Sequence, residues 1–144
     1  MVRNIRRKPT AEDAPTVDGV VEAMDQVRSE IVVRLRKIAL RLAGTSERTV
    51  YDGFFREWTA AVYVGDKQLF HVHNFRSGLR ATVFVGVNSL EPVALHSEEV
   101  SLAVRENVAS TSGRTMKQVK FPLSCMDDLE PLMELVRLKW SMET

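Results

Sequence analysis

The stretches QLFHVHNF (68–75) and LRATVFVGV (79–87) decide the fold of this 144-residue chain. Both are rich in β-branched and aromatic residues and alternate with a period of two, which is typical of β-strands. The dipeptide SG (77–78) between them is a turn signal. The two stretches are therefore predicted to form an antiparallel hairpin.

Further strands extend this hairpin. TAAVYV (59–64) precedes it across the turn residues GDK (65–67), and RTVYDGF (48–54) adds a shorter fourth strand. The later stretch MKQVKFPLS (116–124) returns to the strand pattern. Its Pro122 has no N–H to donate to a neighbouring strand, which predicts an edge position. The sequence thus predicts a meander of three to four strands plus a later edge strand.

A long N-terminal helix is predicted from about Asp18 to Ala43, with Gly44 as its C-terminal cap. Its apolar residues recur at steps of three and four and share one stripe. The stripe consists of Val20, Met24, Val27, Ile31, Leu35, Ile38 and Leu42. Val33 and Leu40 fall on the opposite side. Either the helix breaks near its middle, or its back contacts a second copy of the chain in a homodimer.

Two more helices complete the predicted fold. Ser97 is expected to cap a helix that buries Val104 and ends at Gly113, because the carboxylates after Ser97 suit a first helical turn. The last helix is expected from about Asp128 to Met142, with Asp128 as its cap. The predicted class is α+β, an antiparallel sheet with the long N-terminal helix and two further helices packed mainly on one face.

Composition indicates one globular domain, because 44% of residues are apolar and 27% are charged. We predict a flexible basic tail over residues 1–14, with Arg3, Arg6 and Arg7, before a single domain at 15–144. The net charge of +1 makes nucleic acid the least supported partner. No apolar run is long enough for a transmembrane helix or a signal peptide, so a cytoplasmic location is expected.

Motifs for catalysis are missing from the sequence. There is no glycine-rich phosphate loop, no H-E-x-x-H and no G-x-S-x-G. The single Cys125 excludes an internal disulfide and multi-cysteine metal sites, and its apolar neighbours predict a buried thiol. In YDGFFREW (51–58) Glu57 precedes Trp58, where an indole would raise the pKa of a carboxyl group, although a packed tryptophan at a strand entry explains the same letters. We therefore expect a non-catalytic protein.

The face on which the histidines lie depends on the turn. Alternation places Leu69, His71, His73 and Phe75 on one side of the strand, and Phe70, Val72 and Asn74 on the other. With SG (77–78) as a two-residue turn, His71 pairs with Phe84, and Phe70 shares an apolar face with Val83 that the helices cover. A three-residue turn (76–78) would instead put the histidines on that apolar face. We favour the first turn because it separates polar from apolar side chains.

The second face then holds the candidate site. It displays His71, His73, Arg80, Thr82 and Phe84, with Thr59 and Tyr63 from the neighbouring strand, and Trp58 is added as a binding residue. The simplest interpretation is a solvent-facing sheet whose histidines hydrogen-bond locally. The second is a surface for a small molecule or protein partner, with aromatic rings to stack and Arg80 to orient. The third is an iron or zinc site at His71 and His73, which supply only half of a four-ligand shell.

The stretches YDG (51–53), KQLFHVHNF (67–75), GRTMKQVKFPLS (113–124) and DDLEPLMELVRLKW (127–140) resemble the YdhG-like superfamily of small domains of unknown function. The resemblance spans roughly residues 35 to 140. Matching residues include Lys117, Phe121, Leu129, Leu135 and Lys139, which imply a shared α+β fold. Some members are described as frataxin-like iron-binding proteins, but YDGF (51–54) departs from the group's usual proline-containing turn, and a dense acidic ridge is missing.

Overall fold

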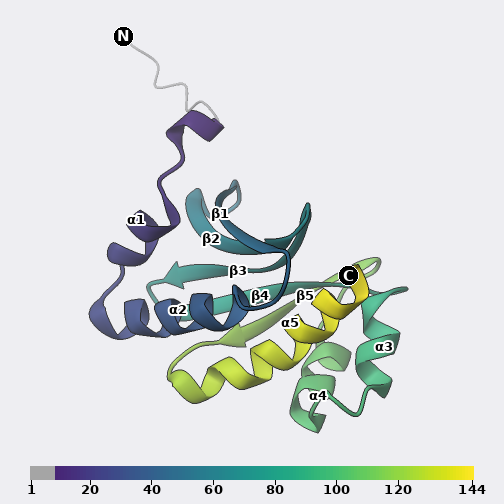
Figure 1. Ribbon diagram of the computed structural model, residues 1–144. Helices are drawn as coiled ribbons and strands as arrows, with labels where there is room; N and C mark the ends of the chain where they lie inside the picture. The colour runs from purple at the N-terminus through teal and green to yellow at the C-terminus, as the bar shows by residue number, and fades with distance from the viewer. Residues whose placement is uncertain (1–8) are drawn as a thin grey trace.

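A computed structural model describes residues 9–144 as an α+β fold (Figure 1). The sheet is antiparallel, with its five strands in the order in which they follow one another along the chain. The strands are β1 (Thr45–Asp52), β2 (Glu57–Val64), β3 (Lys67–Phe75), β4 (Gly78–Gly86) and β5 (Met116–Pro122). The predicted α+β class is confirmed. Arg3, Arg6 and Arg7 of the predicted basic tail lie outside the described residues.

Five α-helices accompany the sheet in the described part of the chain. They are α1 (Val17–Glu22), α2 (Gln26–Ala39), α3 (Leu90–His96), α4 (Leu102–Ser110) and α5 (Leu129–Glu143). Two short 3₁₀ turns, η1 (Ala11–Asp13) and η2 (Met126–Asp128), precede α1 and α5. Helices α2 and α5 lie along one face of the sheet, and β1 and β2 curve away on the other side (Figure 1).

The prediction of one long N-terminal helix is wrong, because the chain breaks between α1 and α2. Asp25 is extended, and its carboxylate accepts a hydrogen bond from the N–H of Arg28 at 2.9 Å, which starts a new helix. The break folds α1 back, so Asp18 reaches Arg36 at 2.8 Å. In one continuous helix these two residues would be about 27 Å apart. Val27, expected on the buried stripe, is 63% exposed.

The helix predicted after Ser97 is also placed wrongly. The residues that follow β4 form α3, and α4 then begins after Ser101. The Ser101 hydroxyl accepts from the N–H of Val104 at 3.4 Å and donates to Glu134 at 2.9 Å, so contact with α5 fixes the start of α4. The helix ends at Ser110, before Gly113.

The turn between β3 and β4 lies one residue earlier than expected, which shifts the strand pairing by two residues. Arg76 and Ser77 form it, so His71 pairs with Thr82 and not with Phe84. A shift of two residues preserves the side to which every side chain points. The predicted division into an apolar face and a histidine face therefore survives the wrong register.

Leu69 is the exception to this alternation. Phe70 pairs with Val62, but Gln68 pairs with Tyr63, so Leu69 is an extra residue in a β-bulge. The bulge turns Leu69 into the core, where it is fully buried, and places Gln68 beside the histidines. The expected position of Leu69 on the histidine face is wrong for this reason.

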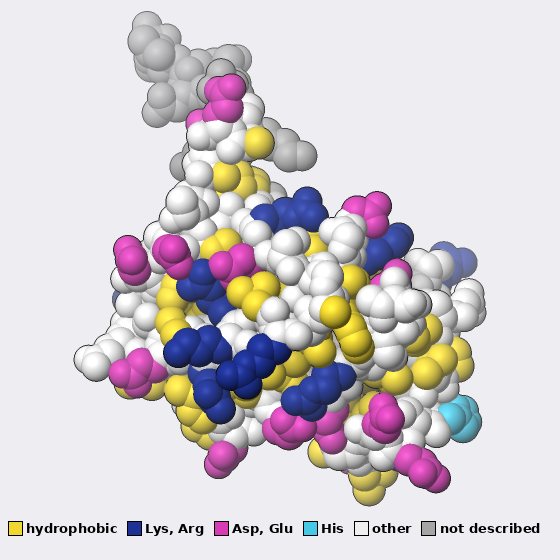
Figure 2. All heavy atoms as spheres, in the orientation of Figure 1, with side chains coloured by type: hydrophobic (Ala, Val, Ile, Leu, Met, Phe, Trp, Pro, Cys, Tyr) yellow, Lys and Arg dark blue, Asp and Glu magenta, His cyan; other side chains and the backbone are white. Residues whose placement is uncertain are grey.

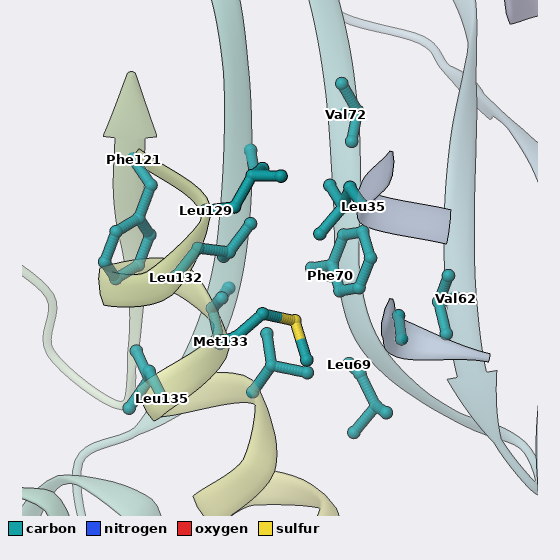
Figure 3. Close-up of a cluster of buried hydrophobic side chains, with 14 of the residues drawn as sticks. Leu35, Val62, Leu69, Phe70, Val72, Phe121, Leu129, Leu132, Met133 and Leu135 are labelled. Atoms are coloured by element: carbon teal, nitrogen blue, oxygen red, sulfur yellow. The ribbon is translucent and has the colours of Figure 1, made fainter. Parts of the chain in front are cut away.

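The core fills the space between the sheet and helices α2 and α5. Leu35 of α2 lies beside Phe70 of β3, and Leu132 and Met133 of α5 point into the same space (Figure 3). Leu35, Leu132 and Met133 are fully buried. Lys and Arg side chains gather in one patch on the face in view in Figure 2, with Asp and Glu side chains around it. The thiol of Cys125, predicted to be buried, is exposed.

Candidate functional site

The face of the sheet opposite helices α2 and α5 contains a cavity of about 590 Å³. All five strands contribute to its lining, together with residues 53–55 of the loop between β1 and β2. Cavities that bind small molecules have this size and this mixture of aromatic and polar side chains.

Six of the residues predicted on this face line the cavity: Thr59 of β2, His71 and His73 of β3, and Arg80, Thr82 and Phe84 of β4. Tyr63 and Trp58 do not line it. The Tyr63 hydroxyl accepts a hydrogen bond from Gln68 at 3.2 Å, and the Trp58 ring packs edge-on against Tyr51 at 5.4 Å.

His71 is held by a chain of side-chain hydrogen bonds. The amide nitrogen of Gln68 donates to Tyr63, so the amide oxygen is left to accept from Nδ1–H of His71 at 2.7 Å. This arrangement leaves Nε2 of His71 with a free lone pair. Burial, with a further effect from the charge of His73, lowers the pKa of His71 to about 4. His71 is therefore neutral at pH 7.

His73 is more deeply buried, with 2% of its surface exposed. Its Nε2 lies 2.8 Å from Oδ2 of Asp52 and 3.8 Å from Oε1 of Glu57. Its ring stacks on Phe75, with the centroids 4.7 Å apart and the planes within 7°. The ring of Phe55 contacts His73 edge-on at 5.3 Å. The position of the His73 imidazole is thus fixed from two sides.

Asp52 is one of the residues of this site that the sequence interpretation missed. Its Oδ1 accepts from the backbone N–H groups of Phe54 at 2.9 Å and Phe55 at 3.2 Å, which shapes the turn after β1 and leaves Oδ2 for His73. Burial acts to raise the pKa of Asp52, but the N–H of Phe55, His73 and the N–H of Phe54 together lower it. Asp52 is therefore an ionised carboxylate at pH 7. In the sequence, Asp52 followed by Gly53 indicated a turn and gave no sign of a contact with a histidine.

The pKa of Glu57 is shifted in the opposite direction to that of Asp52. Burial raises its pKa, the charge of Asp52 adds to the effect, and His73 opposes it. The sequence suggested a raised pKa through an indole, whereas the structure attributes it to burial and a neighbouring carboxylate. Two carboxyl groups with pKa values shifted in opposite directions thus flank one imidazole.

One ligand atom from each of Asp52, His71 and His73 lies within 4.8 Å of the others. The third histidine is elsewhere: His96 is exposed at the end of α3, with Nδ1 2.8 Å from the carbonyl oxygen of Pro92. A metal shell at this point can therefore use two imidazoles and one carboxylate.

Several buried polar atoms of the site have no hydrogen-bond partner among residues 9–144. They are Nδ1 of His73, Nε of Arg80, Oγ1 of Thr82 and Oε1 of Glu57. No ion pair within these residues joins Arg80 to a carboxylate, and its guanidinium lies over the ring of Phe75 at 4.5 Å. More than nine in ten buried polar groups in folded proteins are satisfied, so four unpartnered atoms in one place are an unusual feature of this site.

Comparisons with protein families, with curated proteins and with solved structures find no match to this chain. The resemblance to the YdhG-like superfamily stays a prediction. No helix in the part of the chain that the structure describes is long and apolar enough to cross a membrane.

Proposed function

We propose that this protein binds a small organic anion with a flat apolar part in the cavity opposite helices α2 and α5. The observation that carries the proposal is the set of unpartnered polar atoms on Arg80, Thr82 and His73, all at the cavity lining. Arg80 Nε–H and the Thr82 hydroxyl can both donate to an anion. Because the site is concave, a small molecule fits it better than a flat protein surface does.

The charges around the cavity favour an anionic ligand. Arg80 and Lys120 contribute two positive charges to the lining, and Asp52 contributes one negative charge. Both carboxylate oxygens of Asp52 already accept hydrogen bonds from the protein. The guanidinium of Arg80 is not paired with Asp52, and it can hold a ligand carboxylate with two parallel hydrogen bonds.

Aromatic side chains provide the apolar part of the site. Phe55 packs edge-on against Phe75 at 4.7 Å and remains 45% exposed. Phe54, next to it in the loop, is 86% exposed, and Phe84 approaches His71 at 5.3 Å. Exposed phenylalanine at the rim of a polar cavity is expected where a ring-shaped ligand covers it.

The test is an NMR titration with benzoate and 2-naphthoate, with benzyl alcohol as the uncharged comparison. We expect shifts of backbone amide signals to concentrate on β3 and β4. The variant Arg80→Met should weaken binding of the acids by about 10- to 100-fold, because it removes a charge-assisted hydrogen bond. Arg34→Met is the matched control, since Arg34 is an exposed cation on α2, away from the cavity.

A second variant separates loss of binding from loss of folding. Thr82→Val keeps the shape of the side chain and replaces only the hydroxyl with a methyl group. It should weaken binding of the acids, while the dispersion of the amide signals should show that the protein is still folded. The proposal is wrong if neither acid shifts signals of β3 and β4 at millimolar concentration. It is also wrong if Arg80→Met and Arg34→Met bind the acids equally well.

A further inference from the structure

We infer that Asp52, His71 and His73 bind one divalent transition-metal ion of the zinc type on the floor of the same cavity. Their ligand atoms all lie within 4.8 Å of one another. A tetrahedral ion with bonds of about 2.1 Å holds its ligand atoms about 3.4 Å apart. The widest pair must therefore approach by about 1.4 Å, which small side-chain rotations of the ligand residues can supply.

The two imidazoles have different outer contacts, and each suits a metal ligand. A ligating histidine usually donates its other ring N–H to a protein group that fixes the ring. His71 does so through Nδ1–H to Gln68, which Tyr63 orients in turn. His73 is fixed by stacking on Phe75. Its Nε2 and Oδ2 of Asp52, 2.8 Å apart, would both turn to the ion, and the proton between them would move to Nδ1 of His73, which has no hydrogen-bond partner among residues 9–144.

The donor set selects the class of ion. Two imidazole nitrogens and one carboxylate oxygen suit zinc and its transition-metal neighbours, whereas calcium and magnesium prefer oxygen ligands throughout. The positive charge of Arg80 in the lining opposes binding of a metal cation, and the negative charge of Asp52 offsets it.

Three protein ligands leave one position on the ion open to the cavity. Arg80, whose Nε has no partner among the described residues, lies on the strand beside His73. One carboxylate oxygen of an organic anion can occupy the open position while Arg80 binds the second oxygen. This part of the inference rests on the proposed function. The ion would then explain why polar side chains lie at the bottom of a cavity whose rim is aromatic.

The experiment titrates metal-free protein with Zn²⁺ against a chromophoric chelator, and with Co²⁺ to follow its visible absorption. We expect one equivalent of Zn²⁺ and the intense bands of four-coordinate cobalt. His71→Ala together with His73→Ala should weaken binding by more than about 100-fold, and Asp52→Asn by about 10- to 100-fold. His96→Ala is the matched control and should bind Zn²⁺ as the unchanged protein does, because His96 is exposed outside the cavity.

Metal binding that is unaffected by the double histidine change would overturn the inference, as would a wild-type affinity weaker than millimolar. If the double variant does not fold, Asp52→Asn and His71→Gln, which change little in size, provide the same comparison. The benzoate titration repeated in EDTA separates the two proposals. Binding of benzoate without binding of Zn²⁺ overturns the metal site alone, and binding of Zn²⁺ without benzoate overturns the organic ligand alone.

Discussion

The buried histidine on β3 predicts how the stability of the metal-free protein depends on pH. The pKa of His71 is about 4 in the folded protein, against an ordinary value of 6.5. As the pH falls below 6.5 the unfolded chain takes up a proton that the folded protein cannot, so stability is lost between pH 6.5 and pH 4. From these two values the loss between pH 7.5 and pH 5 is about 2 kcal/mol. The pKa of Asp52 is lowered from 3.8, so this carboxylate stays ionised over that range.

Urea unfolding in EDTA at several pH values, followed by tryptophan fluorescence, measures this loss. His71→Gln should have a lower stability at pH 7.5 but should lose about 2 kcal/mol less than the unchanged protein on going to pH 5. His96→Gln is the control and should retain the full loss, because His96 is exposed. An equal loss in His71→Gln and the unchanged protein would refute the reasoning. An NMR titration in which the His71 ring gains its proton near pH 6.5 would do the same.

Two further predictions concern the helical layer and use the same urea assay. Leu35→Ala should cost about 2–5 kcal/mol, because a fully buried side chain leaves a cavity between α2 and β3. Val33→Ala, on the outer side of the same helix, should change stability by less than about 0.5 kcal/mol, and equal costs would contradict the assigned packing. Asp25→Ala should cost about 1 kcal/mol through loss of the helix cap, whereas Asp25→Asn, which can still accept the Arg28 N–H, should cost much less. Equal stability of all three proteins would show that Asp25 does not separate α1 from α2.

The break in the N-terminal helical region had a local signal that the stripe of apolar residues concealed. Asp25 is a favourable N-cap residue, and it stands directly before the first residue of α2. The apolar spacing nevertheless continues through it, because Met24 and Ile31 are buried on either side of the break. The spacing of apolar residues indicates which residues are buried in the core. Two short helices at an angle produce the same spacing as one long helix. The contact of Asp18 with Arg36 shows that the chain folds back.

Part of the candidate site could be predicted from the sequence. The period of two placed His71, His73, Arg80, Thr82 and Phe84 on one face, and all five line the cavity. What the sequence did not indicate was burial, since the histidine face was expected to be open or partly covered. The curvature of the sheet and the loop after β1 enclose that face, and neither has a signature in the spacing of residues.

The sequence alone determined which side chains share a face, because alternation along a strand is a property of the backbone and survives any even shift in register. Tertiary structure decided the rest. It brought Asp52 to His73 across 21 positions of the chain, turned Leu69 inward at a bulge, and left Arg80 without a carboxylate partner within residues 9–144. These features depend on how four strands bend and pair at once, and no short stretch of sequence contains that information.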